Sequence, residues 1–184
     1  MLVVITGPSG VGKTTIIKRF LKRNPEFKYS VSLTTRSPRS REINGIDYYF
    51  VSEEDFLKLI ERDDFAEWSK VYGRYYGRLK KDLEGTTDSG YVIVGIDVQG
   101  AKKLKDRYPK GLFVFLMPKS ESALENQLRS RGTDDPEEIK KRLNEALIEL
   151  KQADDFDYKL INNKINQTVK ELESIIKEQK PKKQ

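Results

Sequence analysis

Short apolar runs and amphipathic stretches alternate along the chain, and this alternation predicts an α/β fold. Residues 2–6, LVVIT, are apolar up to a glycine-rich stretch. Such a run is typical of a strand that is buried on both faces of a parallel sheet. Further strands are predicted at residues 29–33, 47–51, 65–69, 72–77, 91–96, 112–117 and 158–161. We therefore expect a central parallel sheet with helices on both faces.

Helical periodicity and helix-start signals occupy the segments between these strands. Ser52 and Asp55 form a capping box at the start of one helix. Ile139, Leu143 and Leu147 lie on a single apolar stripe of another. The predicted helices cover residues 14–23, 53–62, 79–90, 98–107, 120–130, 136–150 and 167–178.

A phosphate-binding loop is the strongest motif in the sequence. Residues 7–14, GPSGVGKT, match G-x-x-x-x-G-K-[ST] between a predicted strand and a predicted helix. The glycines let backbone N–H groups wrap phosphate oxygens, and the helix N-terminus adds partial positive charge. We expect Lys13 to reach the β- and γ-phosphates of a nucleoside triphosphate and Thr14 to offer its hydroxyl to Mg²⁺. The predicted triphosphate-binding residues are Gly7, Pro8, Ser9, Gly10, Val11, Gly12, Lys13, Thr14 and Thr15.

The composition limits the chemistry to a few side-chain types. The chain has 184 residues, enough for one domain with a sizeable core, and it contains no Cys and no His. Disulfides, thiolate chemistry and the usual zinc ligands are therefore excluded. Phosphoryl transfer remains possible, because it depends mainly on positioning and on charge stabilisation by Lys, Arg and a bound metal.

A compact polar segment predicts a second phosphate site. Its candidates are a hydroxyl, two guanidinium groups and two phenols, from Ser32, Arg36, Arg39, Tyr48 and Tyr76. Guanidinium forks bind the phosphate dianion bidentately. On the residues alone, the arginines could also belong to a solvated loop and the tyrosines to a core.

Five segments carry a family resemblance: residues 30–52, FAEW at 65–68, YYG at 75–77, IDVQG at 96–100, and residues 129–143. In order and spacing they resemble the guanylate kinase family over nearly the whole chain. The resemblance implies Mg²⁺-dependent transfer of the γ-phosphoryl group of ATP to GMP, giving ADP and GDP. It also implies a three-layer P-loop fold with a core (1–31, 89–121 and 153–184), a GMP-binding region (32–88) and a helical lid (122–152).

The resemblance also implies roles for single residues. Glu67 would accept hydrogen bonds from N1–H and N2–H₂ of guanine, and Asp97 would lie near the base or, with Thr14, near the metal. Arg131 and Arg142 would be lid arginines. Asn162 would lie near the adenine ring. The predicted catalytic residues are Lys13, Arg39, Arg131 and Arg142. The predicted GMP-binding residues are Ser32, Arg36, Arg39, Tyr48, Glu67, Tyr76, Gly77, Arg78 and Asp97.

Three positions depart from the family pattern. Arg78 stands where a small hydroxyl residue is usual, Gly95 replaces an acidic residue, and Gln127 replaces an arginine. Domains of this kind also occur as protein-binding modules, so a phosphopeptide at the Arg36 and Arg39 site is an alternative. A P-loop kinase for another small acceptor is a third hypothesis.

The remaining expectations concern partners and location. The net charge of +6 comes largely from lysines near the C-terminal end, which we interpret as a solvated helix end and tail. Neither a nucleic-acid-binding pattern nor a membrane-spanning apolar run is present in the sequence. We expect a cytoplasmic monomer or weak dimer with ATP and GMP as its partners.

Overall fold

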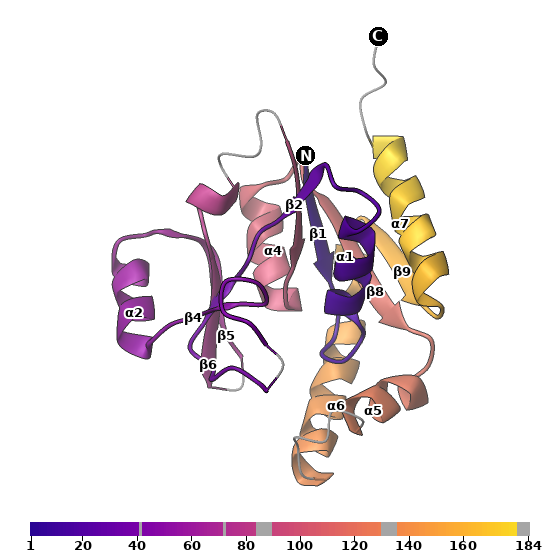
Figure 1. Cartoon of the computed structure of the whole chain (residues 1–184). Coiled ribbons are helices and arrows are strands. Elements are labelled where there is room, and N and C mark those ends of the chain that lie inside the picture. Colours follow the sequence, from indigo (N-terminus) through magenta and orange to yellow (C-terminus); the bar gives the residue numbers. More distant parts are fainter. Residues whose placement is uncertain (41, 72, 84–89, 130–135, 180–184) are drawn as a thin grey trace.

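A five-stranded parallel sheet forms the centre of the protein (Figure 1). The computed structural model describes all residues except 41, 72, 84–89, 130–135 and 180–184. The strand order is β2-β7-β1-β8-β9. The strands are β1 (Leu2–Thr6), β2 (Phe27–Tyr29), β7 (Tyr91–Gly95), β8 (Leu112–Pro118) and β9 (Tyr158–Asn162), and all their pairings are parallel. The predicted fold class is confirmed.

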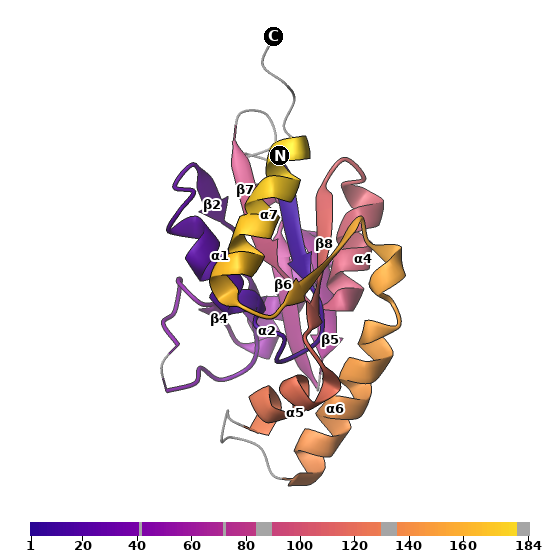
Figure 2. The same ribbon diagram turned by 90° about the vertical axis from the view of Figure 1, so that its right-hand side faces the viewer.

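Alternate residues of β1 face two different halves of the core. Val3 and Ile5 belong to the cluster beneath α1 (Lys13–Leu21) and α7 (Ile165–Gln179). Leu2 and Val4 belong to the cluster beneath α4 (Val98–Arg107). Figures 1 and 2 show these helices on opposite faces of the sheet. Burial of both faces explains why Leu2 to Ile5 are all apolar. Thr6, the last residue of the strand, is polar and donates its hydroxyl to Ile96 O at 3.1 Å.

A second, smaller sheet contains both parallel and antiparallel strands, in the order β4-β3-β6-β5. Its strands are β3 (Leu33–Thr34), β4 (Tyr49–Phe50), β5 (Phe65–Val71) and β6 (Arg74–Leu79). Helix α2 (Glu53–Glu61) covers it and begins as predicted, because the Ser52 side chain accepts a hydrogen bond from Asp55 N at 3.0 Å. The Phe56 and Phe65 rings stack at 4.4 Å in a separate small core.

Two helices, α5 (Glu121–Arg129) and α6 (Pro136–Leu150), project below the central sheet in Figure 1. The chain then passes through a 3₁₀ turn, Ala153–Asp155, into β9. Within the described part of the chain, none of the helices combines the length and the apolar character that crossing a membrane requires.

Two predicted elements were wrong in detail. The single strand expected at 29–33 is two strands, one in each sheet. Ser30 N donates to Ile93 O of the central sheet, whereas Ser32 O accepts from Tyr49 N, so the backbone changes sheets between them. The helix expected from residue 79 begins at residue 81, because Leu79 still pairs with Phe65 in β6. Its continuation through 84–89 lies outside the described residues.

Gly77 is a packing position in the small sheet. A Cβ atom there would lie 2.7 Å from Phe65 Cε1 and 2.9 Å from Phe56 Cζ. Because these rings are stacked, we expect Gly77→Ala to destabilise the protein by about 1–3 kcal/mol. Thermal unfolding of the variant and the wild type would measure the change. An unchanged melting temperature would contradict this account, since the rings would then yield at no cost.

Candidate active site

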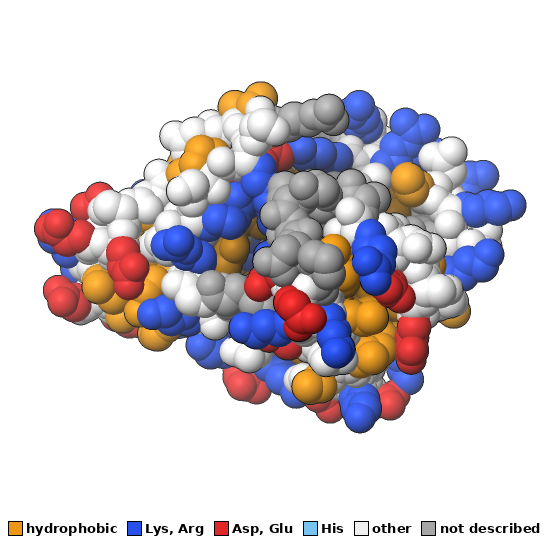
Figure 3. All heavy atoms as spheres, turned by 90° about the horizontal axis from the view of Figure 1, so that it is seen from below, with side chains coloured by type: hydrophobic (Ala, Val, Ile, Leu, Met, Phe, Trp, Pro, Cys, Tyr) orange, Lys and Arg blue, Asp and Glu red, His pale blue; other side chains and the backbone are white. Residues whose placement is uncertain are grey.

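A cleft of about 1070 Å³ separates the central sheet, the small sheet and α6. Residues from all three parts line it. Figure 3 views the molecule from below, the side on which α6 projects. Lys and Arg side chains lie around the centre of this face with several Asp and Glu side chains among them, and a further group of Asp and Glu side chains lies at the end that carries α2.

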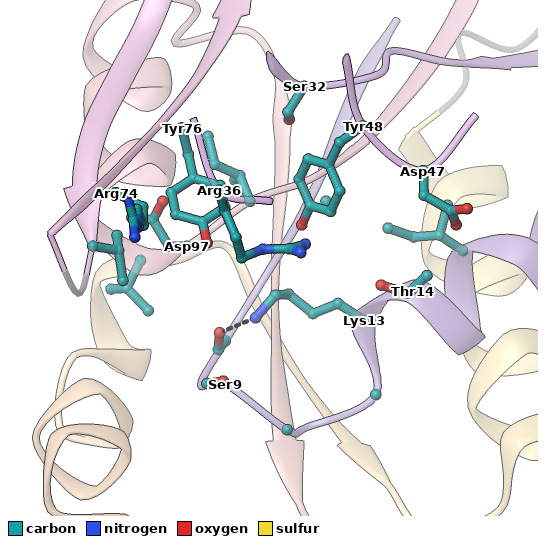
Figure 4. A pocket seen from close by; sticks show the side chains of 18 of the residues that line it. Ser9, Lys13, Thr14, Ser32, Arg36, Asp47, Tyr48, Arg74, Tyr76 and Asp97 are labelled. Atoms are coloured by element: carbon teal, nitrogen blue, oxygen red, sulfur yellow. Dashed lines mark hydrogen bonds between the residues drawn. The ribbon is translucent and has the colours of Figure 1, made fainter. Parts of the chain in front are cut away.

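The predicted P-loop connects β1 to α1 at one wall of the cleft. Gly7 and Gly12 have φ values of 134° and 96°, in the left-handed region that favours glycine. A Cβ on Gly7 would also lie 2.4 Å from Leu116 O. Lys13 Nζ donates to Gly7 O at 2.5 Å and to Pro8 O at 3.1 Å (Figure 4). The predicted residues that line the cleft here are Gly7, Ser9, Gly10, Gly12, Lys13, Thr14 and Thr15.

The predicted phosphate-binding side chains gather opposite this loop. Figure 4 shows Arg36, Tyr48 and Tyr76 pointing into the space above Lys13. Burial raises the pKa of Tyr48 to about 12, so its hydroxyl keeps its proton. Ser32 and Arg39 line the same cleft, so the structure brings this predicted set together.

Sequence reasoning missed Glu42, which binds both arginines. Its carboxylate accepts hydrogen bonds from Nη1 and Nη2 of Arg36, at 2.8 and 2.9 Å, and from the backbone N–H of Arg39 at 2.8 Å. These hydrogen bonds hold the pKa of Glu42 below its usual range although its partial burial opposes the shift. The signal in the sequence was an isolated carboxylate six residues after Arg36 in a basic segment.

Two carboxylates lie at the far end of the cleft. Glu67 of β5 is 5% exposed, and burial raises its pKa to about 8; Asp97 adds to the shift, whereas Arg78 and Lys103 oppose it. Asp97 caps α4 by accepting from Gly100 N at 2.9 Å, and it also accepts from Ser69 Oγ at 2.8 Å. Both carboxylates line the cleft, as predicted.

Gly77 and Arg78 do not line this cleft, although both were predicted as GMP-binding residues. Gly77 faces the stacked phenylalanines of the small core. The Arg78 side chain is fully buried behind the wall, where Nη2 donates to Ser32 Oγ at 2.6 Å. Nη1 lies 3.9 Å from Glu67 Oε1. The β5–β6 pairing explains this contact, because Glu67 is the register partner of Arg78.

The other predicted residues have separate positions. Asn162 donates to Val11 O at 2.8 Å and so braces the P-loop; neither it nor Val11 or Pro8 lines the cleft. Arg142 lines the cleft from α6 and lies 3.3 Å from Glu138. Gln127 is exposed on α5. Arg131 lies outside the described residues.

Glu149 on α6 is a second carboxylate that sequence reasoning missed. It lines the cleft near Lys13, and its carboxylate accepts a hydrogen bond from the Ser9 backbone. Burial raises its pKa. Because it follows Arg142 by seven residues, two helical turns, the two share one face of the helix. That spacing was the signal available in the sequence.

These features define a P-loop nucleotide-binding protein of the α/β class. A phosphate-binding loop joins a central parallel strand to a helix, and a cationic pocket faces it across a shared cleft. Ligands in such sheets bind at the carboxyl ends of the strands, where this loop lies.

Comparisons with known proteins identify the family within this class. The guanylate kinase family model matches residues 1–179, and the chain belongs to the guanylate kinase family. The chain is 46% identical over 181 residues to the guanylate kinase of Carboxydothermus hydrogenoformans, covering 98% of this chain and 89% of that protein. It is 42% identical to the guanylate kinase of Prochlorococcus marinus over 177 residues, 96% of both chains.

Solved structures agree with this assignment. The crystal structure of guanylate kinase from Anaplasma phagocytophilum superposes with a TM-score of 0.80 at 31% identity, covering 99% of this chain and 87% of that one. Shikimate kinase from Bacteroides thetaiotaomicron superposes with a TM-score of 0.50 at 13% identity over 96% of this chain and 98% of its own. The latter similarity concerns the fold alone.

The raised pKa of Glu67 predicts a pH-dependent stability. Between its ordinary value of 4.5 and about 8, the folded protein holds a proton that the unfolded chain releases. This contribution to stability is complete below pH 4.5 and is lost as the pH rises toward 8, by at most about 1.4 kcal/mol per pH unit. Glu67→Gln cannot titrate, so its melting temperature should fall less than that of the wild type between pH 5.5 and 8. Parallel slopes would mean that Glu67 is already ionised in the folded protein.

Proposed function

We propose that the protein transfers the γ-phosphoryl group of ATP to GMP, with Mg²⁺, giving ADP and GDP. One observation carries the proposal: the P-loop lysine and a cradle of Arg36, Tyr48 and Tyr76 face each other across one cleft. Two phosphate sites on opposite walls fit a donor and an acceptor that must meet end to end. Membership of the guanylate kinase family supports the same reaction.

At the ATP end, the P-loop backbone and Lys13 would bind the β- and γ-phosphates. Lys13 now donates to two carbonyl groups of its own loop, so it would exchange them for phosphate oxygens. This exchange replaces neutral acceptors with charged ones, which form the stronger hydrogen bonds.

The donor set fits Mg²⁺. No group of three or more His, Cys, Asp or Glu suited to a metal occurs among the described residues. Mg²⁺ needs few protein ligands, because it keeps several waters and binds substrate phosphates. Thr14, whose side chain lies at the cleft, would hold it. Asp97, the second proposed metal residue, lines the same cleft but lies on the other side of the pocket in Figure 4, near Tyr76. When bound, Mg²⁺ neutralises phosphate charge.

At the GMP end, Arg36, Arg39, Tyr48 and Tyr76 would bind the phosphate, and Glu67 would accept from N1–H and N2–H₂ of guanine. Glu42 preorganises Arg36, because a fork that already fits a carboxylate also fits a phosphate. Adenine offers no adjacent pair of donors at this edge, so the carboxylate favours guanine.

The transfer step needs no general base, because the attacking phosphate oxygen is already an anion. ATP and GMP bring about six negative charges and Mg²⁺ offsets two of them, which leaves about four for the protein. The proposed cations are Lys13, Arg36, Arg39, Arg131 and Arg142. Closure of the lid and of the GMP-binding region would exclude water and so prevent hydrolysis of ATP.

The phosphopeptide-binding alternative is less well supported. A peptide-binding module would need the Arg36 pocket but would not need a complete P-loop with Lys13. One chain supplies all the proposed site residues, so we propose that the protein acts as a monomer or weak dimer. We also propose that it has no nucleic-acid partner, because its sequence carries no nucleic-acid-binding pattern. Because its proposed substrates are cytoplasmic nucleotides, we propose the same location for the protein.

Replacement of the P-loop lysine tests the ATP site. In Lys13→Met, turnover should fall by about 10²–10³-fold, because one preorganised cation on the transferred group is lost. The measurement is GDP formation with saturating ATP and GMP, with circular dichroism to confirm folding. Lys22→Met is the matched control, since Lys22 is exposed at the other end of α1. Near wild-type turnover of a folded Lys13→Met would refute the ATP site.

Replacement of Arg39 tests the GMP phosphate site. Arg39→Ala should raise the Michaelis constant for GMP by roughly 10- to 150-fold, the effect of losing a charge-assisted hydrogen bond worth about 1.5–3 kcal/mol. The constant for ATP should change little, which provides an internal control. If only the Michaelis constant for ATP increased, Arg39 would belong to the ATP site and the proposed GMP phosphate site would be wrong. The assay is steady-state kinetics with each nucleotide varied in turn.

A further inference from the structure

A guanidinium group is completely buried behind the end of the cleft that Glu67 lines, where the guanine base is proposed to bind. Arg78 has an exposure of 0%, which is rare for an arginine. Its Nη2 donates to Ser32 Oγ at 2.6 Å, to Ser30 O at 3.2 Å and to Gly95 O at 3.4 Å. Its Nε and Nη1 have no hydrogen-bond partner among the described residues. Such a costly arrangement suggests a role beyond packing.

The nearest acidic group is Glu67, and the pair is looser than a direct ion pair. Nη1 lies 3.9 Å from Glu67 Oε1, with both side chains almost fully buried. The other charged groups that act on Glu67 are Asp97, which disfavours its ionised form, and Lys103, which favours it. Removal of Arg78 would therefore leave Glu67 buried and facing Asp97 with one cation fewer. The carboxyl group would then keep its proton to higher pH.

The residue at position 95 is compatible with this pair. Gly95 brings no carboxylate that could compete with Glu67 for the guanidinium, and its carbonyl accepts from Nη2. A Cβ at this position would lie 2.7 Å from Ile17 Cδ1. The two departures at positions 78 and 95 are therefore in contact, and a glycine at 95 is compatible with the buried arginine at 78.

The contact with Ser32 fixes the direction of a hydroxyl proton. Because Ser32 Oγ accepts from Arg78 Nη2, its own hydrogen must point elsewhere. Ser32 lines the cleft, so this hydrogen is available to a ligand. Ser32 would then donate while an ionised Glu67 accepts.

This pattern matches one edge of guanine. O6 is an acceptor, and N1–H and N2–H₂ are donors, so a hydroxyl donor beside a two-oxygen acceptor is complementary to it. Adenine presents an amino group in place of O6 and an unprotonated N1, and it would meet the wrong partner at both positions.

We propose that Arg78 is a positioning residue for base recognition: its guanidinium group favours the accepting, ionised form of Glu67, and its hydrogen bond turns the Ser32 hydroxyl toward the base. The proposal rests on the proposed function, in which Glu67 reads guanine. Arg78 acts through these two residues and does not touch the nucleotide itself.

Three substitutions separate its effects. Arg78→Met removes both charge and donors, Arg78→Lys keeps the charge, and Arg78→Gln keeps donors without charge. Arg78→Met should raise the Michaelis constant for GMP by about 10- to 100-fold, with that for ATP within about twofold. Arg78→Lys should recover part of this loss. Arg23→Met is the matched control, because the exposed Arg23, which follows α1, pairs with Glu173 of α7 at 2.7 Å.

A double-mutant cycle and a pH profile distinguish positioning from a merely structural role. If Arg78 acts through Glu67, Arg78→Met should lower GMP affinity less in the Glu67→Gln background than in the wild type, and only the part that acts through Ser32 should remain. GMP affinity should rise with pH as Glu67 ionises. In Arg78→Met and Arg78→Gln this rise should occur at higher pH. The GMP phosphate also ionises in this pH range. Glu67→Gln serves as the reference, because its pH profile contains the ionisation of the phosphate without that of Glu67.

Each outcome decides the proposal. A raised GMP constant, a non-additive cycle and a shifted pH profile would support it. Unchanged GMP constants, or fully additive effects, would overturn it. If all three Arg78 variants fail to fold by circular dichroism, Arg78 is a structural residue and the proposal also falls. A wild-type protein that does not phosphorylate GMP would instead refute the proposed function, which this assay reports separately.

Discussion

The burial of β1 on both faces is the constraint on which the site depends. Val3 and Ile5 on one face and Leu2 and Val4 on the other fix the strand at the centre of the sheet, between β7 and β8. The P-loop, which connects β1 to α1, is thereby placed at the carboxyl edge of the central sheet. Because β7 is parallel to β1, it delivers Asp97 to the same edge. One buried strand thus positions groups that are 90 residues apart.

Charge balance explains much of the rest of the cleft. Cations gathered for phosphates would repel one another before a ligand binds, and carboxylates within the protein oppose this repulsion. Glu42 binds Arg36, and Glu138 lies beside Arg142. Glu149 lies near Lys13 and accepts from the P-loop backbone. Each pair holds a cation close to the position in which a phosphate would meet it.

The base end of the cleft depends on the junction of the two sheets. Ser30 and Ser32 lie where the chain passes from one sheet to the other, and both accept hydrogen bonds from Arg78. Arg78 in turn pairs in register with Glu67 across β5 and β6. A residue that departs from the family pattern is therefore built into the wall that supports the predicted guanine reader.

The sequence by itself determined the central sheet, the P-loop and the candidate residues for two phosphate sites, because these follow from local patterns: an apolar run, a glycine motif and closely spaced arginines. Tertiary structure decided the rest. Whether Arg78 faces the ligand or lies behind it depends on which strands pair, and the division of residues 29–33 between two sheets depends on hydrogen-bond partners far along the chain. Glu42 and Glu149 looked like ordinary surface carboxylates until folding placed them beside cations. A local pattern specifies an element, but the partner of a charged side chain is fixed only when distant segments pack together.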